Sequence, residues 1–311
     1  MISARRPLHR HTLLAAAVLL SAGLIACSSD GGGARSPSSG LAAATAPDNS
    51  AIDTTPSTTI TAPASTTPTT TSTTTTTTTT TTTIAVPTAS GPLDLTHDIV
   101  GLGFSAGGRP IFAERYGTPG GRRVLVIGVI HGDEDDGLAI VDELRRRDVP
   151  DGVELWIVES MNPDGQAAQD RHNDNDVDLN RNFPYKWGTI GVPGDGQYAG
   201  TGPASEPETQ AITNFISQLR PDIALWYHQD LFVINPAQGR EGRVRARYAE
   251  LASLPMGEIT GGTYTGIAAT WARQELSDAD GVAFIVELGA TLSPEEAATH
   301  ADAVLTIAVE G

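Results

Sequence analysis

Cysteine is almost absent from this chain, since Cys27 is the single one among 311 residues. It lies close to the N-terminus, and residues 28–311 contain no thiol. A domain without cysteine forms no disulfides and cannot hold a metal through thiolates. Any metal site must therefore be built from histidine and carboxylate side chains.

Basic residues are also scarce, with 20 Lys and Arg against 37 Asp and Glu and a formal net charge of −17. Proteins that bind nucleic acid use clustered Lys and Arg to displace counterions from phosphates. The acidic balance therefore argues against nucleic acid as a partner. A simpler use of the excess negative charge is to keep the protein soluble.

The N-terminal apolar run, Leu13 to Ala26, is too short to span a bilayer comfortably. It follows a basic start, which is the pattern of a secretory signal. The run ends in Leu-Ile-Ala before Cys27, which resembles the bacterial lipoprotein cleavage box. We expect residues 1–26 to be a signal peptide and Cys27 to be diacylated, which would anchor the protein outside the cell membrane, facing the cell wall. An ordinary signal peptide or an uncleaved anchor, with Cys27 incidental, is the alternative.

Residues 27–92 contain Ser, Thr, Ala, Gly and Pro with almost no large apolar side chain. Within them, residues 69–83 are threonine interrupted only by Ser72. Such a segment cannot bury enough apolar surface to offset its chain entropy. We expect a disordered tether that gives an anchored domain reach.

Residues 93–311 change to short apolar runs that alternate with amphipathic segments. Continuous apolar runs predict strands that are buried on both faces, at residues 124–130, 153–158, 223–227 and 282–286. Helical patterns lie at residues 138–147 and 206–219, and a last helix should start at Ser293, with Pro294 at its first position and Glu296 in a capping box. The alternation predicts an α/β domain with a mixed, mostly parallel, twisted sheet sandwiched by helices.

Two histidines and a glutamate follow predicted strands. His131 and Glu134 leave the end of the 124–130 run, and His228 ends the 223–227 run. Zinc accepts imidazole and carboxylate ligands, and a catalytic zinc keeps one position open. The other histidines lie in the signal, at the start of the domain, in a polar loop or on the last helix, so His228 is the best third ligand. A hydrogen-bonded structural histidine is the alternative.

Glu287 ends a further apolar run, just before Leu288 and Gly289. A carboxylate at the end of a buried strand is costly unless it is solvated or functional. A metal-dependent hydrolase needs a base that is not a ligand, to take a proton from water and return it to the leaving group. Glu287 is placed for this role, and a solvated glutamate at the sheet edge is the alternative.

Six segments, in order, make residues 93–311 resemble the zinc carboxypeptidase family typified by carboxypeptidase A. The His131-x-x-Glu134 pair resembles the first two ligands, and His228 takes the place of the third. Glu287, in V-E-L-G, takes that of the catalytic glutamate. The other three segments are Asn-Pro-Asp-Gly at 162–165, Asp-Leu-Asn-Arg-Asn at 178–182 and Ser-Glu-Pro-Glu at 205–208.

The resemblance implies roles for further residues. Asp178 would hold and orient His131, and Arg171 would stabilise the oxyanion. Asn180 and Arg181 would bind the substrate carboxylate, with Tyr264 the nearest match to the family's tyrosine there. The alternatives are a solvated loop arginine for Arg171 and turn-forming polar residues for the Asn-Arg pair.

The resemblance also implies the activity: one zinc ion per domain, and hydrolysis of an amide bond next to a carboxylate-bearing residue of a peptide or murein peptide. The 93 residues between Glu134 and His228 are a compact spacing, similar to that of bacterial members that act on murein peptides. A general peptide-scavenging carboxypeptidase, an N-acyl amino acid amidohydrolase and an inactive lipoprotein that binds wall fragments are the alternatives. The sequence does not reveal the oligomeric state.

Overall fold

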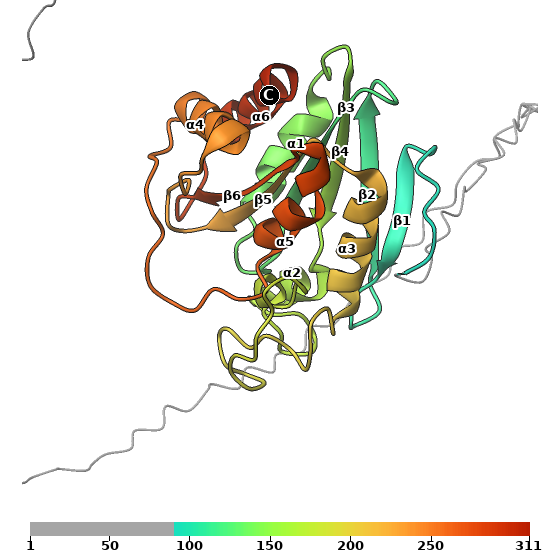
Figure 1. Ribbon diagram of the computed structural model, residues 1–311, viewed down its shortest axis with the longest axis vertical. Helices are drawn as coiled ribbons and strands as arrows, with labels where there is room; N and C mark the ends of the chain where they lie inside the picture. The colour runs from blue at the N-terminus through green and yellow to red at the C-terminus, as the bar shows by residue number, and fades with distance from the viewer. Residues whose placement is uncertain (1–89) are drawn as a thin grey trace, which may run out of the picture. The chain divides into compact units, whose positions relative to one another are not determined.

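The computed structural model describes residues 90–311 (Figure 1). The expectations for the signal peptide, the lipidation of Cys27 and nearly all of the tether lie outside these residues. The described part contains a six-stranded sheet in the order β1-β2-β4-β3-β5-β6. Its strands are β1 (Ile99–Phe104), β2 (Pro110–Gly117), β3 (Arg122–Val129), β4 (Val153–Ser160), β5 (Ile223–Gln229) and β6 (Val282–Leu288).

The sheet is mixed and mostly parallel, as the sequence predicts. Strands β4, β3, β5 and β6 pair in parallel, whereas β1 and β2 join β4 through antiparallel pairs. The four predicted apolar runs correspond to the four parallel strands, and no strand bound differs from the predicted one by more than two residues. The antiparallel edge strands were not predicted.

Helices cover both faces of the sheet, and each face has its own apolar core (Figure 1). One face packs against α1 (Gly137–Arg146), α4 (Gly239–Leu251) and α6 (Pro294–Glu310). The other packs against α3 (Pro207–Leu219) and α5 (Ala268–Glu275). Short helical turns complete the fold: α2 (Pro163–Ala168), η1 (Leu179–Arg181) and η2 (Ser277–Ala279).

The predicted start of the last helix is confirmed. The Ser293 side chain accepts a hydrogen bond from the Glu296 N–H at 3.2 Å, and the Glu296 carboxylate accepts one from the Ser293 N–H at 2.8 Å. This reciprocal capping box, with Pro294 at the first position, satisfies backbone donors that the helix leaves free. The predicted helices at 138–147 and 206–219 correspond to α1 and α3, whereas α4 and α5 were missed.

Strand alternation decides on which face the candidate site lies. Side chains two residues apart on a strand point to the same face. Trp226 belongs to the core on the α3 and α5 side, so His228 points to that side too. Glu287 follows Ile285 in the same way and pairs with His228 in the β5–β6 register. His228 and Glu287 are therefore neighbours at the carboxyl end of the parallel strands.

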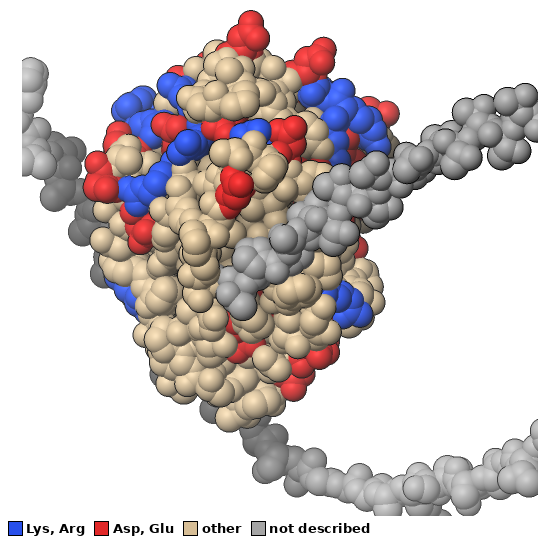
Figure 2. All heavy atoms as spheres, turned by 90° about the vertical axis from the view of Figure 1, so that its right-hand side faces the viewer, with Lys and Arg blue, Asp and Glu red and all other residues tan. Residues whose placement is uncertain are grey.

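Basic and acidic side chains lie next to one another at the upper end of the face shown in Figure 2, and the lower end is mostly uncharged. Such mixing agrees with the ion pairs along the surface, for example Arg145 with Glu159 at 2.6 Å and Arg147 with Asp302 at 2.8 Å. Among residues 90–311, no helix combines the length and the apolar character needed to cross a bilayer.

Helix α3 begins with two buried carboxylates. Glu208 is fully buried and accepts hydrogen bonds from the Ala106 N–H at 2.8 Å and from the Asn173 side chain at 3.1 Å. Glu206 accepts from the same Asn173 amide at 2.8 Å. Burial, with a smaller contribution from the negative charge of Glu206, raises the pKa of Glu208 to about 7.

The raised pKa predicts how stability depends on pH. The folded protein keeps a proton on Glu208 that the unfolded chain releases above the ordinary value of 4.5, so stability falls as pH rises from 4.5 to about 7. The loss is on the order of 1.4 kcal/mol for each pH unit in that window. The measurement is the free energy of unfolding, from chemical denaturation of wild type and Glu208→Gln across pH 4.5–8. The variant should lack the part of the pH-dependent fall in stability that comes from Glu208.

Glu250→Gln, at an exposed position on α4, is the matched control and should keep the wild-type slope. Parallel pH profiles for wild type and Glu208→Gln would contradict the assignment.

Candidate metal centre

Three side chains that the sequence singled out converge at the carboxyl end of the sheet. His131 and Glu134 lie in the loop after β3, and His228 is near the end of β5. Their nearest nitrogen and carboxylate oxygen atoms all lie within 4.8 Å of one another. The Nδ1 atom of His131 is 2.9 Å from one Glu134 oxygen, and the Nδ1 atom of His228 is 3.0 Å from the other.

This group fits zinc. Ligand atoms about 2 Å from a tetrahedral zinc ion lie about 3.3 Å apart, and the distances from Glu134 to the two histidines are close to that value. His131 and His228 are almost fully buried. Burial, with the positive charges of His131 and Arg171 nearby, lowers the pKa of His228 despite the opposing effect of Glu134, which favours the neutral form that binds metals. The donor set is two imidazoles and one carboxylate, which is typical of catalytic zinc.

A buried carboxylate holds the ring of His131 in place. Asp178 is fully buried, and its Oδ1 lies 3.0 Å from the Nε2 atom of His131. This contact assigns the proton to Nε2 and leaves Nδ1 free to bind a metal. Burial opposes the ionisation of Asp178, but the charges of His131, Arg171 and Arg181 outweigh it and hold its pKa well below the usual range.

Arg171 lies directly beside the ligands. Its guanidinium donates to Asp178 through Nε at 3.2 Å and Nη2 at 2.9 Å, and Nη1 donates to Glu134 at 2.7 Å. Nη1 also lies 3.0 Å from Nδ1 of His131. Arg171 and a metal ion therefore compete for the same ligand atoms, whereas its two bonds to Asp178 do not involve those atoms.

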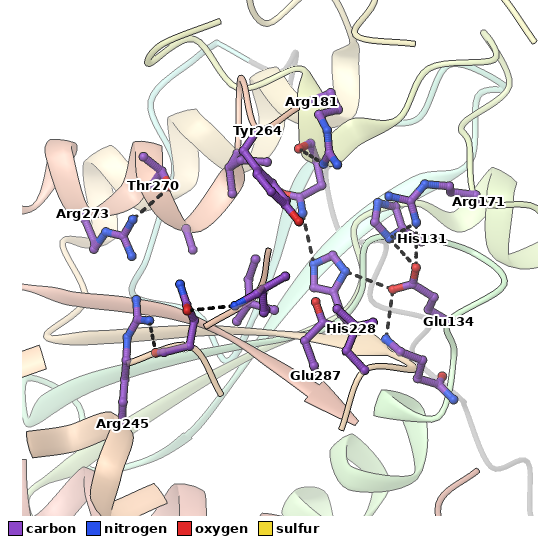
Figure 3. A pocket seen from close by; sticks show the side chains of 18 residues that line it. His131, Glu134, Arg171, Arg181, His228, Arg245, Tyr264, Thr270, Arg273 and Glu287 are labelled. Carbon is purple, nitrogen blue, oxygen red and sulfur yellow. Dashed lines mark hydrogen bonds and ion pairs between the residues drawn. The ribbon is translucent and has the colours of Figure 1, made fainter. Parts of the chain in front are cut away.

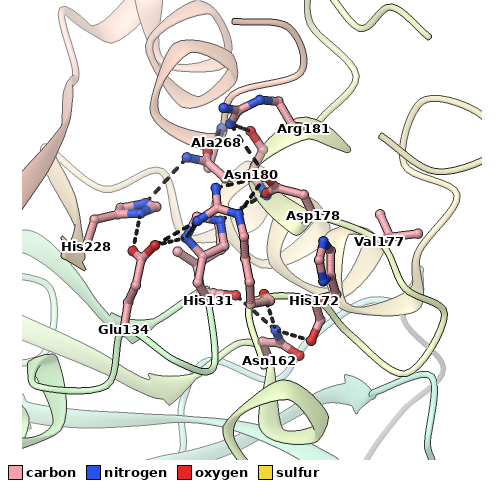
Figure 4. A network of polar contacts seen from close by, with 12 residues as sticks. His131, Glu134, Asn162, His172, Val177, Asp178, Asn180, Arg181, His228 and Ala268 are labelled. Atoms are coloured by element: carbon pink, nitrogen blue, oxygen red, sulfur yellow. Dashed lines mark hydrogen bonds and ion pairs between the residues drawn. The ribbon is translucent and has the colours of Figure 1, made fainter. Parts of the chain in front are cut away.

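The Asn-Pro-Asp-Gly turn connects the ligand loop to the loop that carries Arg171 (Figure 4). The Asn162 side chain accepts from the Gly165 N–H at 3.0 Å, which caps α2. Its amide donates to the carbonyl of Ile130 at 3.1 Å and to that of His172 at 3.2 Å. An added Cβ on Gly132 would come within 1.9 Å of the Gly165 backbone, so only glycine allows this close approach.

Glu287 lies beside the ligands without being one of them (Figure 3). It lines the same pocket, the residue is 9% exposed, and it pairs with His228 across β5 and β6. Burial and the negative charge of Glu134 raise the pKa of Glu287 to about 7, against the opposing charges of His131 and Arg171. A carboxyl group with such a pKa can both take and return a proton near neutral pH.

The predicted carboxylate-binding residues lie on the other side of His228. The Asn180 side chain is 3.4 Å from His228 Nε2 and accepts from the Ala268 N–H at 3.0 Å. Arg181 is buried, and its guanidinium lies 5.6 Å from the centre of the Tyr264 ring. Asn180, Arg181 and Tyr264 all line the pocket, and Tyr264 is 54% exposed at its edge.

Two glutamines form hydrogen bonds with the acidic loop after His131. Gln229 donates to the Asp136 carboxylate and accepts from the Asp136 N–H, both at 3.0 Å. Gln169 donates to Asp135 at 2.9 Å. These bonds give two aspartates of the loop a structural role. The Gln229 N–H also donates to the Glu134 carboxylate at 3.1 Å.

Sequence reasoning missed part of the pocket wall. The pocket has a volume of about 380 Å3 and reaches past the ligands to α4 and α5. Arg245 on α4 and Arg273 on α5 line this part, together with Asn235 and Thr270. No motif marks these residues. A helix rich in arginine has the same sequence pattern whether one of its arginines lines a pocket or all of them are exposed to solvent.

Comparison with known proteins agrees with this geometry. The family model "Zinc carboxypeptidase" matches residues 95–235. Murein peptide amidase A of Escherichia coli K12 is 30% identical over 158 residues, which are 47% of this chain and 64% of that protein. Carboxypeptidase SOL1 of Arabidopsis thaliana is 31% identical over 136 residues, 40% of this chain and 26% of that protein. The chain thus spans somewhat less than two thirds of the length of the amidase.

Solved structures have the same fold. Carboxypeptidase A from Helicoverpa armigera superposes with a TM-score of 0.60 and 19% identity, covering 68% of this chain and 67% of that one. Murein-tripeptide amidase MpaA from Escherichia coli O157 superposes with a TM-score of 0.54 and 24% identity, covering 73% and 98%. Residues 95–235 are thus similar to the zinc carboxypeptidase family, and the fold is that of the solved carboxypeptidase and of the solved amidase.

The contact between Asp178 and His131 generates a prediction for metal binding. Asp178→Asn keeps the size of the side chain but removes the charge that supports His131, so zinc affinity should fall about 10- to 100-fold. Competition with a chelator of known affinity, at constant pH, measures the change. Asp174→Asn, an exposed position in the same loop, should leave the affinity unchanged. Equal affinities in both variants would show that Asp178 does not support the ligand.

Proposed function

We propose that this chain is a zinc-dependent peptidase that cleaves an amide bond next to a carboxylate-bearing residue, with Glu287 as the general base. The observation that carries the proposal is the position of Glu287 beside His228, in a pocket that also contains Arg171 and Arg181. When bound by His131, Glu134 and His228, zinc supplies a Lewis acid that polarises a carbonyl and lowers the pKa of water.

Residues of the chain would carry out proton transfer, stabilise the oxyanion and bind the substrate. Glu287 would accept the proton of the attacking water and pass it to the leaving amine. Arg171, which lies beside Glu134 at 2.7 Å, would supply positive charge for the developing oxyanion. Asn180 and Arg181 would hold the carboxylate of the leaving residue, since a guanidinium matches the geometry of a carboxylate. The pocket would thereby fix the scissile bond next to the end of a chain or an acidic branch.

For the substrate we favour a peptide of the bacterial cell wall. Two relatives support this choice, since one is named murein peptide amidase A and a solved relative is titled murein-tripeptide amidase. The lipoprotein-like cleavage box at Cys27 supports it independently, because an anchored enzyme outside the membrane meets wall peptides first. Relatives named as carboxypeptidases make ordinary C-terminal peptides the comparison substrates for the test.

The role of Glu287 is tested by Glu287→Gln. The amide cannot take a proton, so kcat should fall by roughly 10²- to 10⁴-fold while zinc content and substrate affinity remain. Turnover of murein tripeptides and of ordinary C-terminal peptides, followed by mass spectrometry, measures both rate and substrate class. Glu250→Gln on the surface of α4 should retain full activity. Retained turnover in Glu287→Gln, with zinc bound, would rule out this carboxylate as the base.

The anchor is tested by Cys27→Ser. Without the thiol no thioether-linked diacylglycerol can form, so a labelled fatty acid should be incorporated into wild type and lost from the variant. The measurement is metabolic labelling of cells that express the full chain, with membrane and soluble fractions compared. Ser29→Ala should be labelled like wild type. Equal labelling of wild type and Cys27→Ser would refute lipidation at this position.

A further inference from the structure

The pocket has a second basic region, away from the metal ligands. Figure 3 shows Arg245 and Arg273 together on the side of the pocket opposite Arg171 and Glu134, with His228 and Glu287 between. Arg245 comes from α4 and Arg273 from α5, so two helices meet to form this region. We call these two side chains the distal arginine pair. Neither belongs to the proposed catalytic apparatus.

Arg245 is an unusual residue for the wall of a pocket because it is only 4% exposed. Its Nη1 donates to the Asn235 carbonyl at 2.6 Å, and its Nη2 donates to the Glu241 carboxylate and to the Ala283 carbonyl. Its Nε has no hydrogen-bond partner among residues 90–311. A buried guanidinium with an unused donor is costly unless a ligand or another group completes it.

The distal arginine pair has more positive charge than its surroundings neutralise. A single carboxylate oxygen, Oε1 of Glu241, accepts from both arginines, from Arg273 at 3.1 Å. The other contact of Arg273 is to the neutral Thr270 hydroxyl at 2.9 Å. Among residues 90–311, the two guanidinium groups therefore share one carboxylate, which leaves one positive charge without an acidic partner.

The other residues that line the pocket limit which ligands can reach the distal arginine pair. Ile259, Ile267 and Ile285 line the same pocket and offer apolar contact to an aliphatic stem. Arg181, near Tyr264, is a separate cation in Figure 3 and is the proposed partner of the substrate's main-chain carboxylate. A residue that uses both basic regions needs one carboxylate on its main chain and another at the end of its side chain.

We propose that the distal arginine pair binds a side-chain carboxylate and so makes the enzyme selective for a terminal residue with two carboxylates. This inference rests on the proposed function, because it assigns the second carboxylate subsite of the same pocket. Glutamate carries such a group, and so does diaminopimelate, which also has an ammonium group at the same end. Arg273 is a specificity-determining residue here, and Arg245 is its buried support.

The experiment compares peptides that differ only in the last residue: Glu, Gln, Leu, Lys or diaminopimelate. With zinc-loaded wild type, kcat/KM for Glu should exceed that for Gln by tenfold or more. Arg273→Gln should lower this ratio by about 10- to 100-fold, the range expected for the loss of a charge-assisted hydrogen bond. The matched control is Arg243→Gln, an exposed residue on α4 that does not line the pocket, and it should leave the ratio unchanged.

Glu241→Gln provides a test in the opposite direction. It removes the carboxylate that the two arginines share, so the ratio of Glu to Gln peptides should rise. Glu241→Gln also tests the proposed subsite if Arg273→Gln does not fold. Preference for the diaminopimelate peptide over the Glu peptide would identify a wall peptide as the source of the carboxylate, and the reverse would identify an acidic amino acid; either result supports the subsite.

Calorimetric binding to Glu287→Gln separates this inference from the proposed function. The Glu peptide should bind that protein at least tenfold more tightly than the Gln peptide, and Arg273→Gln in the same background should abolish the difference. If wild type cleaves no peptide but this pattern holds, the catalytic proposal fails and the subsite stands. Equal binding and equal kcat/KM for Glu and Gln peptides, unchanged in Arg273→Gln and Glu241→Gln, would overturn the subsite alone.

Discussion

The candidate site depends on one buried negative charge, the carboxylate of Asp178. It is fully buried and contacts His131 at 3.0 Å, the Asn180 N–H at 2.9 Å and Arg171 at 2.9 Å. The residue that orients a metal ligand therefore also caps the turn that carries Asn180 and Arg181. Removing one partner of such a network leaves a buried charge unpaired, which costs far more than the pair itself contributes. The candidate metal ligand His131, the guanidinium of Arg171 and the turn that carries Asn180 and Arg181 are thus coupled through a single side chain.

The sheet explains why Glu287 lies beside the candidate metal centre, as the proposed role in proton transfer requires. Parallel pairing aligns His228 with Glu287 and aligns the end of β3 with the end of β4, so polar side chains collect at one edge. Glu134 and Asp178 both have a positively charged partner within hydrogen-bond distance. Among residues 90–311, no ion pair involves Glu287, and burial therefore raises its pKa to about 7. The same burial that would destabilise an ordinary carboxylate gives Glu287 the pKa that suits its proposed role as the base.

Much of this arrangement could be predicted, because it follows from short-range patterns. Four apolar runs gave the four parallel strands, and the Ser293 capping box gave the start of α6. Since the carboxyl ends of parallel strands share one edge, placing His131, His228 and Glu287 at strand ends already implied that they meet. The antiparallel strands β1 and β2 were missed because only part of each is buried, so their apolar runs are short. The bonds of Asn162 to two distant carbonyls require knowledge of the folded loops.

The distal arginine pair was beyond sequence reasoning for a different reason. Arg245 lies in a helix whose sequence, Gly-Arg-Glu-Gly-Arg-Val-Arg, has the charge pattern of an exposed surface, yet tertiary packing buries this one arginine. Its burial depends on α5 and β6, which are far away in the chain. The metal ligands lie at strand ends and adjoining loops, whereas the distal arginine pair lies on helices α4 and α5. Because the two groups are held by different elements and share no hydrogen bond, changes in one should leave the geometry of the other intact. Under the proposed function, a fold built in this way can keep its metal chemistry constant while helices α4 and α5 set the terminal residue that it accepts.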